Sequence, residues 1–393
     1  MKTSQKRSDV VVIGGGMVGA AAALGLAQAG FSVTMLEHQP PAAFEPQSAP
    51  DLRISAIGCA SVALLKQMGA WAAVQQMRSA PYRRLETWEW QSARVAFDAA
   101  ELGLPELGFM VENRILQLAL WQQLAQCANL TLRCPAKLHA LQREGEGWLV
   151  TLDCGEVLAA DLVIGADGAK SQVRQWAAIG TSGWQYRQSC MLITVQTAAP
   201  QQDVTWQQFF PSGPRAFLPL YDDWASLVWY DSPQRIRQLQ GLSMAQLEQE
   251  IAQAFPTRLG AVKAHAAGSF PLVRRHAQRY VQPGLALVGD AAHTINPLAG
   301  QGVNLGYRDV DALLTVLISA RELGESWSSE EVLLRYQRQR RTDNRIMQSG
   351  MDLFYTAFSN NLAPLSVVRN LALMAAERAG ILKQKALKYA LGL

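Results

Sequence analysis

Charged residues are scarce in this sequence. They make up 17% of its 393 residues, whereas an ordinary soluble domain has about 25%. Together with a hydrophobic content of 49%, this excludes a disordered, highly charged chain. The basic excess is small as well, with 36 Lys and Arg against 32 Asp and Glu. We therefore exclude a nucleic-acid partner, which usually requires a clustered basic face. The length is that of two to three domains.

Paired cysteine motifs are absent. The five cysteines are scattered, their number is odd, and no CxxC pair occurs; they are Cys59, Cys127, Cys134, Cys154 and Cys190. This pattern argues against a disulfide framework and against a zinc site. We expect reduced thiols in the core of a cytoplasmic protein, with no metal. Glycine and proline show no repeat, which excludes a collagen-like or low-complexity chain.

A long hydrophobic run occurs only near the N-terminus, from Val10 to Gly30, where Gln28 alone is strongly polar. Its composition is typical of a signal peptide or a membrane span. Its order indicates a buried strand over 9–13, a glycine-rich turn, a small-residue helix that ends at Gly30, and a second strand over 31–36. We therefore predict a dinucleotide-binding unit and no membrane span.

The glycine-rich turn has the spacing GxGxxG. Gly14 permits the tight turn, Gly16 lets the backbone approach a pyrophosphate, and Gly19 lets the helix pack closely on the strand. The helix N-terminus offers free N–H groups and a positive dipole end to that pyrophosphate. Glu37 ends the second strand, close to the ~20-residue spacing expected for a carboxylate that binds a ribose.

Two later motifs also place Asp and Gly after a buried strand. The strand over 162–164 leads to Asp167-Gly168, residue types that suit a turn. The strand over 285–288 leads to Gly289-Asp290, and a carboxylate there can accept hydrogen bonds from a polyol such as a ribityl chain. The loop that follows enters a helix near Gly302, whose N-terminus can stabilise negative charge on a reduced isoalloxazine ring.

His293 is the one histidine inside these motifs. It is a candidate proton relay, although a hydrogen-bonded structural role is the favoured interpretation. No general base can be assigned from the residues alone.

The remaining pattern predicts an α/β fold: a Rossmann-like FAD-binding domain with an inserted, mostly antiparallel β substrate domain and a helical C-terminal tail. Residues 85–97 predict a strand or hairpin, and 61–77, 115–127 and 244–255 predict helices. We expect the FAD-binding domain to comprise 1–78, 107–180 and 272–345, the substrate domain 79–106 and 181–271, and the C-terminal helices 346–393.

The three motifs, in this order, resemble the single-component FAD-dependent aromatic hydroxylases typified by para-hydroxybenzoate hydroxylase. The segment Arg53–Ala56 resembles the flavin-contacting segment of that family. The resemblance implies that Glu37 holds the adenosine ribose, that Arg53 lies near the flavin or the pyrophosphate, and that Asp290 binds the ribityl chain. It also implies roles around the isoalloxazine for Pro297, Gly300 and Gly302, and contact of Asp167, Gly168 and Arg174 with FAD and NAD(P)H.

The chain is more specifically similar to the bacterial ubiquinone-biosynthesis hydroxylases, over residues 108–113 and 291–309. Within that group, residues 82–90, 215–220 and 351–393 most resemble the demethoxyubiquinol (UbiF-type) hydroxylases. This resemblance implies that NAD(P)H is a transient reductant of FAD. It implies that a C4a-hydroperoxyflavin formed with O2 hydroxylates a polyprenyl quinol. Phe217, Pro219 and Leu220 are expected to line a lipophilic pocket, and other ubiquinone-biosynthesis proteins are candidate partners.

Several alternatives stay open. They are action at another ring position or on another aromatic substrate, an FAD dehydrogenase that inserts no oxygen, and a flavin-binding scaffold subunit. The tail combines apolar and basic residues: Leu371, Leu373, Met374, Ile381, Leu387 and Leu391 with Arg369, Arg378, Lys383, Lys385 and Lys388. Such a helix can lie on an anionic surface, peripheral to the inner membrane. Packing on the body or on a neighbouring subunit is slightly favoured.

Overall fold

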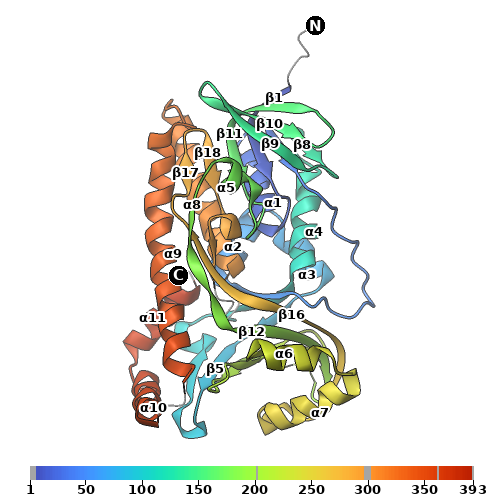
Figure 1. Cartoon of the computed structure of the whole chain (residues 1–393), viewed down its shortest axis with the longest axis vertical. Coiled ribbons are helices and arrows are strands. Elements are labelled where there is room, and N and C mark those ends of the chain that lie inside the picture. The colour runs from blue at the N-terminus through green and yellow to red at the C-terminus, as the bar shows by residue number, and fades with distance from the viewer. Residues whose placement is uncertain (1–5, 201, 296–301, 361–362, 392–393) are drawn as a thin grey trace.

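The computed structural model describes residues 6–200, 202–295, 302–360 and 363–391. Figure 1 shows two large sheets, one above the other, with the long helix α9 (Glu330–Phe358) running beside both. The C-terminal helices lie beside the second sheet. The predicted α/β architecture is confirmed.

The first sheet is built around β1 (Lys6–Ile13), which is the beginning of the hydrophobic run. Its strand order is β17-β18-β11-β1-β2-β8. β1 is parallel to β2 and to β11, β2 is parallel to β8, and β11 is parallel to β18. The strands are β2 (Val33–Leu36), β8 (Leu130–Arg133), β11 (Val157–Gly165), β17 (Val281–Gln282) and β18 (Leu285–Leu287), with β9 (Leu138–Glu144) and β10 (Gly147–Leu152) attached to β11.

The rest of the hydrophobic run forms α1 (Met17–Gln28), which packs against α4 (Asn113–Leu124) and α8 (Gly302–Glu322). Val10, Val11 and Val12 are fully buried, as expected for a parallel strand covered on both faces. Among the described residues, no helix combines the length and the apolar character that crossing a bilayer requires.

The second sheet has the order β19-β16-β12-β15-β14-β13-β5-β6. All neighbours are antiparallel except β13 and β5. Its longest strands, β12 and β16, curve from beside the first sheet into the second (Figure 1). The strands are β5 (Arg84–Trp88), β6 (Val95–Asp98), β12 (Thr181–Thr197), β13 (Val204–Gln208), β14 (Arg215–Pro219), β15 (Trp224–Asp231), β16 (Val262–Ala277) and β19 (His293–Thr294).

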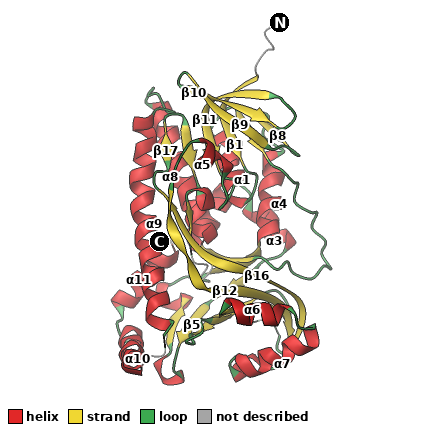
Figure 2. Ribbon diagram, viewed as in Figure 1, coloured by secondary structure: helices red, strands yellow, loops and turns green. Residues whose placement is uncertain are grey.

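Helices α6 (Pro233–Gln240) and α7 (Met244–Ala254) cover the far face of this sheet (Figure 2). The hairpin predicted over 85–97 is confirmed as β5 and β6, and the helix predicted over 244–255 as α7.

A small third sheet is formed by β3 (Ile54–Gly58), β7 (Gly108–Glu112) and β4 (Ala80–Tyr82). Its strands come between β2 and β8 in the sequence. The helix predicted over 61–77 is two helices, α2 (Cys59–Gln67) and α3 (Trp71–Met77), because Gly69 adopts φ +77° between them. α5 (Gln172–Trp176) follows β11. The five cysteines are unpaired, but the core prediction holds fully only for the buried Cys190. Cys59, Cys127 and Cys134 are partly buried, and the prediction is wrong for Cys154, which is exposed in the turn between β10 and β11.

The helical tail is confirmed, with α10 (Ala363–Glu377) and α11 (Ile381–Leu391) following α9. Leu387 and Leu391 of α11 are buried in a cluster that contains Tyr82 and Met110. Lys383 forms ion pairs with Glu101 and Glu377. Helix α11 therefore packs on the body of the protein, as the favoured interpretation of the tail expected.

Candidate active site

The three glycine motifs follow β1, β11 and β18, which are neighbours in the first sheet. Because the carboxyl ends of parallel strands lie at one sheet edge, the motifs meet there. Gly14 adopts φ +104°, and a methyl group on it would lie 2.5 Å from the carbonyl oxygen of Ala166. A methyl group on Gly19 would lie 1.9 Å from the carbonyl oxygen of Gly14. The first motif is thus in tight contact with the second, and neither glycine can carry a side chain.

The third motif joins this edge through Val18 and Arg174. A methyl group on Gly306 would lie 2.6 Å from the Val18 side chain, so α1 and α8 are in close contact. The buried Arg174 donates hydrogen bonds to the carbonyl oxygens of Ala291 (2.7 Å) and Ala169 (3.0 Å). Arg174 therefore fastens the second motif to the third.

Side chains hold the first motif in place. Glu37 Oε2 accepts a hydrogen bond from the Gly15 N–H at 2.6 Å. Gln117 Nε2 and Trp121 Nε1 each donate to the Gly15 carbonyl oxygen at 2.8 Å. The sequence patterns did not single out Gln117 and Trp121, although their spacing of four residues on a predicted helix places them on one face.

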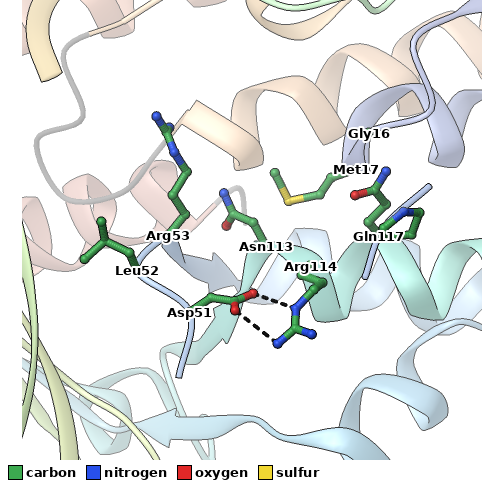
Figure 3. A pocket seen from close by; sticks show the side chains of 9 residues that line it. Gly16, Met17, Asp51, Leu52, Arg53, Asn113, Arg114 and Gln117 are labelled. Atoms are coloured by element: carbon green, nitrogen blue, oxygen red, sulfur yellow. Dashed lines mark hydrogen bonds and ion pairs between the residues drawn. The ribbon is translucent and has the colours of Figure 1, made fainter. Parts of the chain in front are cut away.

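A cavity of about 560 Å³ opens beside the N-terminus of α1, between the segment 41–53 and the start of α4 (Figure 3). It is lined by Gly16, Met17, Pro41, Asp51, Leu52, Arg53, Asn113, Arg114 and Gln117. Arg114 makes a two-pronged ion pair with Asp51, with distances of 2.8 and 3.0 Å. Neither residue was predicted, because their pairing depends on how the segment 41–53 folds onto α4.

Arg53 lies where this cavity meets the second sheet. Its guanidinium is 5.4 Å from the centre of the Phe270 ring, and its carbonyl oxygen accepts from the Asn113 N–H at 3.0 Å. Its charge also acts on Asp290 of the third motif. The roles of Arg53 and Asp290 toward a cofactor stay predictions.

The carboxyl of Asp290 in the third motif is surrounded by protein but open to solvent. Its carboxyl lies deep within the protein, where burial raises its pKa, and the nearby charges of His293 and Arg53 oppose that rise. Its side chain is nevertheless exposed. A carboxylate that is deep and yet accessible is available to a polar ligand inside the molecule.

Behind Asp290, a fully buried carboxylate, Asp309, organises the third motif. It accepts hydrogen bonds from the Gly289 N–H (3.0 Å), Arg340 Nε (2.8 Å) and Asn344 Nδ2 (3.2 Å). His293 Nε2 also bonds it. Burial disfavours the charged form, but His293 and Arg340 outweigh this and hold the pKa of Asp309 below its usual value. His293 is buried in this network, which supports its structural role.

The residues predicted to line a substrate pocket do not share one environment in the structure. Phe217 is 2% exposed and stacks on Trp206, with ring centres 5.4 Å apart, in the core beneath α6 and α7. Pro219 is buried, and Leu220 packs in the cluster that contains Leu387 of α11. The structure therefore does not bring Phe217 to the motif edge.

The opposite face of β14 points toward the cavity. A methyl group on Gly268 of β16 would lie 2.5 Å from Leu52, a residue that lines the cavity. Gly268 pairs with Leu192, Leu192 with Val228, and Val228 with Ala216. Directly paired residues share one face of a sheet. We call this the cavity face; it includes Leu192, Leu218, Val228 and Phe270, all partly exposed.

The residues at the motif edge fit FAD. Asp167 accepts from the Gln172 and Val173 N–H groups through Oδ2, and its buried Oδ1 has no partner among the described residues. α1 has no side-chain cap at its N-terminus. A methyl group on Gly16 or Gly302 would meet no atom of the described residues within 4 Å. An uncapped helix N-terminus, open backbone and the accessible carboxylate of Asp290 are what a dinucleotide requires. Pro297 and Gly300 lie outside the described residues.

Fold and site together define a flavin-binding oxidoreductase. A family model described as FAD binding domain matches residues 7–348, and the chain belongs to this family. It is 67% identical over 386 residues to 3-demethoxyubiquinol 3-hydroxylase of Escherichia coli (strain K12), covering 98% of this chain and 99% of the relative. The chain is therefore an FAD-dependent monooxygenase, and the predictions of class and cofactor are confirmed.

Two further matches agree with this assignment. Ubiquinone hydroxylase UbiL of Rhodospirillum rubrum is 36% identical, covering 99% of this chain and 91% of the relative. The crystal structure of p-nitrophenol 4-monooxygenase PnpA of Pseudomonas putida DLL-E4 superposes with a TM-score of 0.79 at 19% identity, covering 98% and 97% of the two chains. At that identity, the second match shows the fold.

Proposed function

We propose that this chain hydroxylates the ring of demethoxyubiquinol, a polyprenylated quinol precursor in ubiquinone biosynthesis. The observation that carries this proposal is the 67% identity to the 3-demethoxyubiquinol 3-hydroxylase of Escherichia coli over 98% of the chain. The apolar cavity face supports it, because a lipophilic quinol needs an apolar wall beside the motif edge.

When bound, FAD supplies the oxygen activation, after reduction by NAD(P)H. Gly14, Gly16 and Gly19 at the N-terminus of α1 bind the pyrophosphate, Glu37 the adenosine ribose and Asp290 the ribityl chain. These assignments are supported by the uncapped N-terminus of α1 and by the accessibility of the Asp290 side chain.

The flavin ring is assigned to the start of α8. Gly302 leaves open space there, the helix N-terminus favours negative charge on a reduced ring, and Arg53 adds a cation on the side of the cavity. Pro297 and Gly300 are proposed to flank the ring on the resemblance alone. Asp167 and Gly168 complete the cofactor site, with Arg174 holding their motif to the third.

The segments 79–106 and 181–271 are proposed as the substrate domain. Leu192, Leu218 and Val228 exclude water from the reacting ring, which protects activated oxygen from unproductive decay. Phe217, which also lies in these segments, packs in the core beneath α6 and α7. One GxGxxG motif is present, so NAD(P)H is proposed to dock transiently.

Mass spectrometry of the quinone pool tests this function in cells that lack the protein and grow with oxygen. We expect demethoxyubiquinone to accumulate, and ubiquinone to return with the intact chain but not with Asp290→Ala. Because the Asp290 side chain is exposed, its loss is expected to leave the fold intact. Accumulation of an earlier intermediate would move the ring position, and a normal pool in cells without a second hydroxylase would overturn the assignment.

A further inference from the structure

An apolar surface lies exposed on the C-terminal helices. Leu353 and Phe354 at the end of α9 are 70% and 50% exposed, and Val368 and Leu371 of α10 are 62% and 55% exposed. Leu365 and Val367 of α10 extend the surface. We call these six residues the outer patch. Phe354 stacks on Phe358, and the Arg369 guanidinium of α10 lies over the Phe358 ring, so α9 and α10 are joined beneath the outer patch.

The opposite side of α10 is packed on the body of the protein. The outer patch is therefore the solvent-facing side of a helix whose core-facing side is already buried. Arg369 donates to Glu89 at 2.7 Å, and Asn370 bonds the same carboxylate. Leu373 is buried in a cluster that also contains Phe358. Figure 1 shows α10 at the end of the molecule, beside the second sheet.

Positive charge is concentrated in the C-terminal segment that carries the outer patch. Residues 341–393 contain seven basic and three acidic side chains, so the whole net charge of +4 is contributed by this segment. The three acids are engaged: Asp343 with Arg340, Asp352 with Arg274 and Glu377 with Lys383. Four cations of this segment, Arg345, Arg378, Lys385 and Lys388, are exposed.

We propose that the outer patch inserts into an anionic phospholipid bilayer, with the four exposed cations at the headgroups. Exposed apolar side chains together with exposed Arg and Lys on the same helices are the chemistry of an interfacial helix. The charge favours lipid over a second copy of the chain, because two copies would bring like charges together. The proposal deepens the proposed function: a polyprenyl quinol dissolved in a bilayer would then reach the enzyme without crossing water.

Vesicle flotation of the full-length holoenzyme tests this surface. The probes are vesicles of phosphatidylcholine alone and vesicles with one quarter phosphatidylglycerol, both without quinol. We expect flotation with the anionic vesicles, and a roughly hundredfold loss of partitioning for Val368→Asp with Leu371→Asp. The matched control is Leu323→Asp, at a residue just after α8 that is 70% exposed, and it should float like the unmodified protein. Lys385→Glu and Lys388→Glu should each lower partitioning about fivefold or more at low salt.

Three results would overturn the proposal: no flotation of the unmodified protein, equal flotation of the Asp variants, or equal loss in the Leu323→Asp control. A fall in oligomer size of the Asp variants without a change in flotation would assign the outer patch to a second copy instead. Since the vesicles contain no quinol, these outcomes are independent of the quinone-pool result that tests the proposed function.

Discussion

The motif edge and the cavity face solve opposite physical problems. At the motif edge, backbone contacts leave no room even for a methyl group on Gly14 or Gly19, and a buried ionic network fixes the turn that carries Asp290. The cavity face presents partly exposed Leu192, Leu218 and Val228. The edge is rigid because a cofactor must be held in one position, whereas an apolar face accommodates a lipophilic ring and excludes water.

The largest expected effect comes from Asp309, which supports the rigid region. Asp309→Ala leaves Arg340 buried without its central partner, which costs roughly 3–5 kcal/mol of unfolding free energy. FAD affinity should fall as well, because the Gly289 turn loses its acceptor. Denaturation in urea and FAD fluorescence titration measure the two effects. Unchanged FAD affinity in a folded variant would show that the network does not position the third motif.

A matched pair on β14 separates core from cavity face. Phe217→Ala should destabilise the protein by about 3–5 kcal/mol, because its ring is buried against Trp206. The neighbour Leu218→Ala should cost under about 1 kcal/mol and raise the KM for quinol several-fold. Urea denaturation and steady-state kinetics give both values for each variant. The reverse pattern would mean that the two faces are assigned the wrong way round.

Acid should weaken the rigid region through His276, which bonds Gln348 at 3.0 Å. Burial and neighbouring positive charge lower the pKa of His276 from 6.5 to about 4. As pH falls below about 6.5, the unfolded chain binds a proton that the folded chain refuses until about pH 4. Stability is therefore fully present above pH 6.5 and declines toward pH 4, by up to about 3 kcal/mol.

Urea denaturation at several pH values checks this, with His276→Gln as the control that should lose this part of the pH dependence. A stability that increases as pH falls from 6.5 to 4 would contradict the assignment.

A smaller effect than at Asp309 is expected at Arg174. Arg174→Met removes the donor to the Ala291 and Ala169 carbonyl oxygens, and a shift of the second motif against the third should weaken FAD binding about tenfold, or ~1.4 kcal/mol. Fluorescence titration measures the affinity. Recovery of most of the lost affinity in Arg174→Lys would indicate that charge alone suffices, and would argue against a two-carbonyl clamp.

The two regions also differ in what the sequence could predict. Gly14, Gly19 and Gly168 were identifiable because only glycine fits their close contacts or their positive φ. On β14, both faces carry apolar residues, and a one-residue shift exchanges core for cavity. The sequence analysis therefore named residues of both faces, Phe217 and Leu220, because the apolar pattern does not show which face meets the core.

Contacts between distant segments were beyond reach. Asp309 and Arg340 meet only because α9 packs on α8, and nothing local marks either residue. The tail was recognised as apolar and basic, but its outward side depends on the anchoring of Arg369 and Asn370 to Glu89, far away in the chain.

Incorporation of labelled oxygen tests the central claim most directly. Purified protein, loaded with FAD and given NAD(P)H and a demethoxyubiquinol, is incubated under ¹⁸O2, and the product mass is measured beside that of Asp290→Ala. The account predicts one labelled oxygen atom per product molecule with the unmodified chain and no product with the variant. Product without label, or equal labelled product from Asp290→Ala, would contradict it.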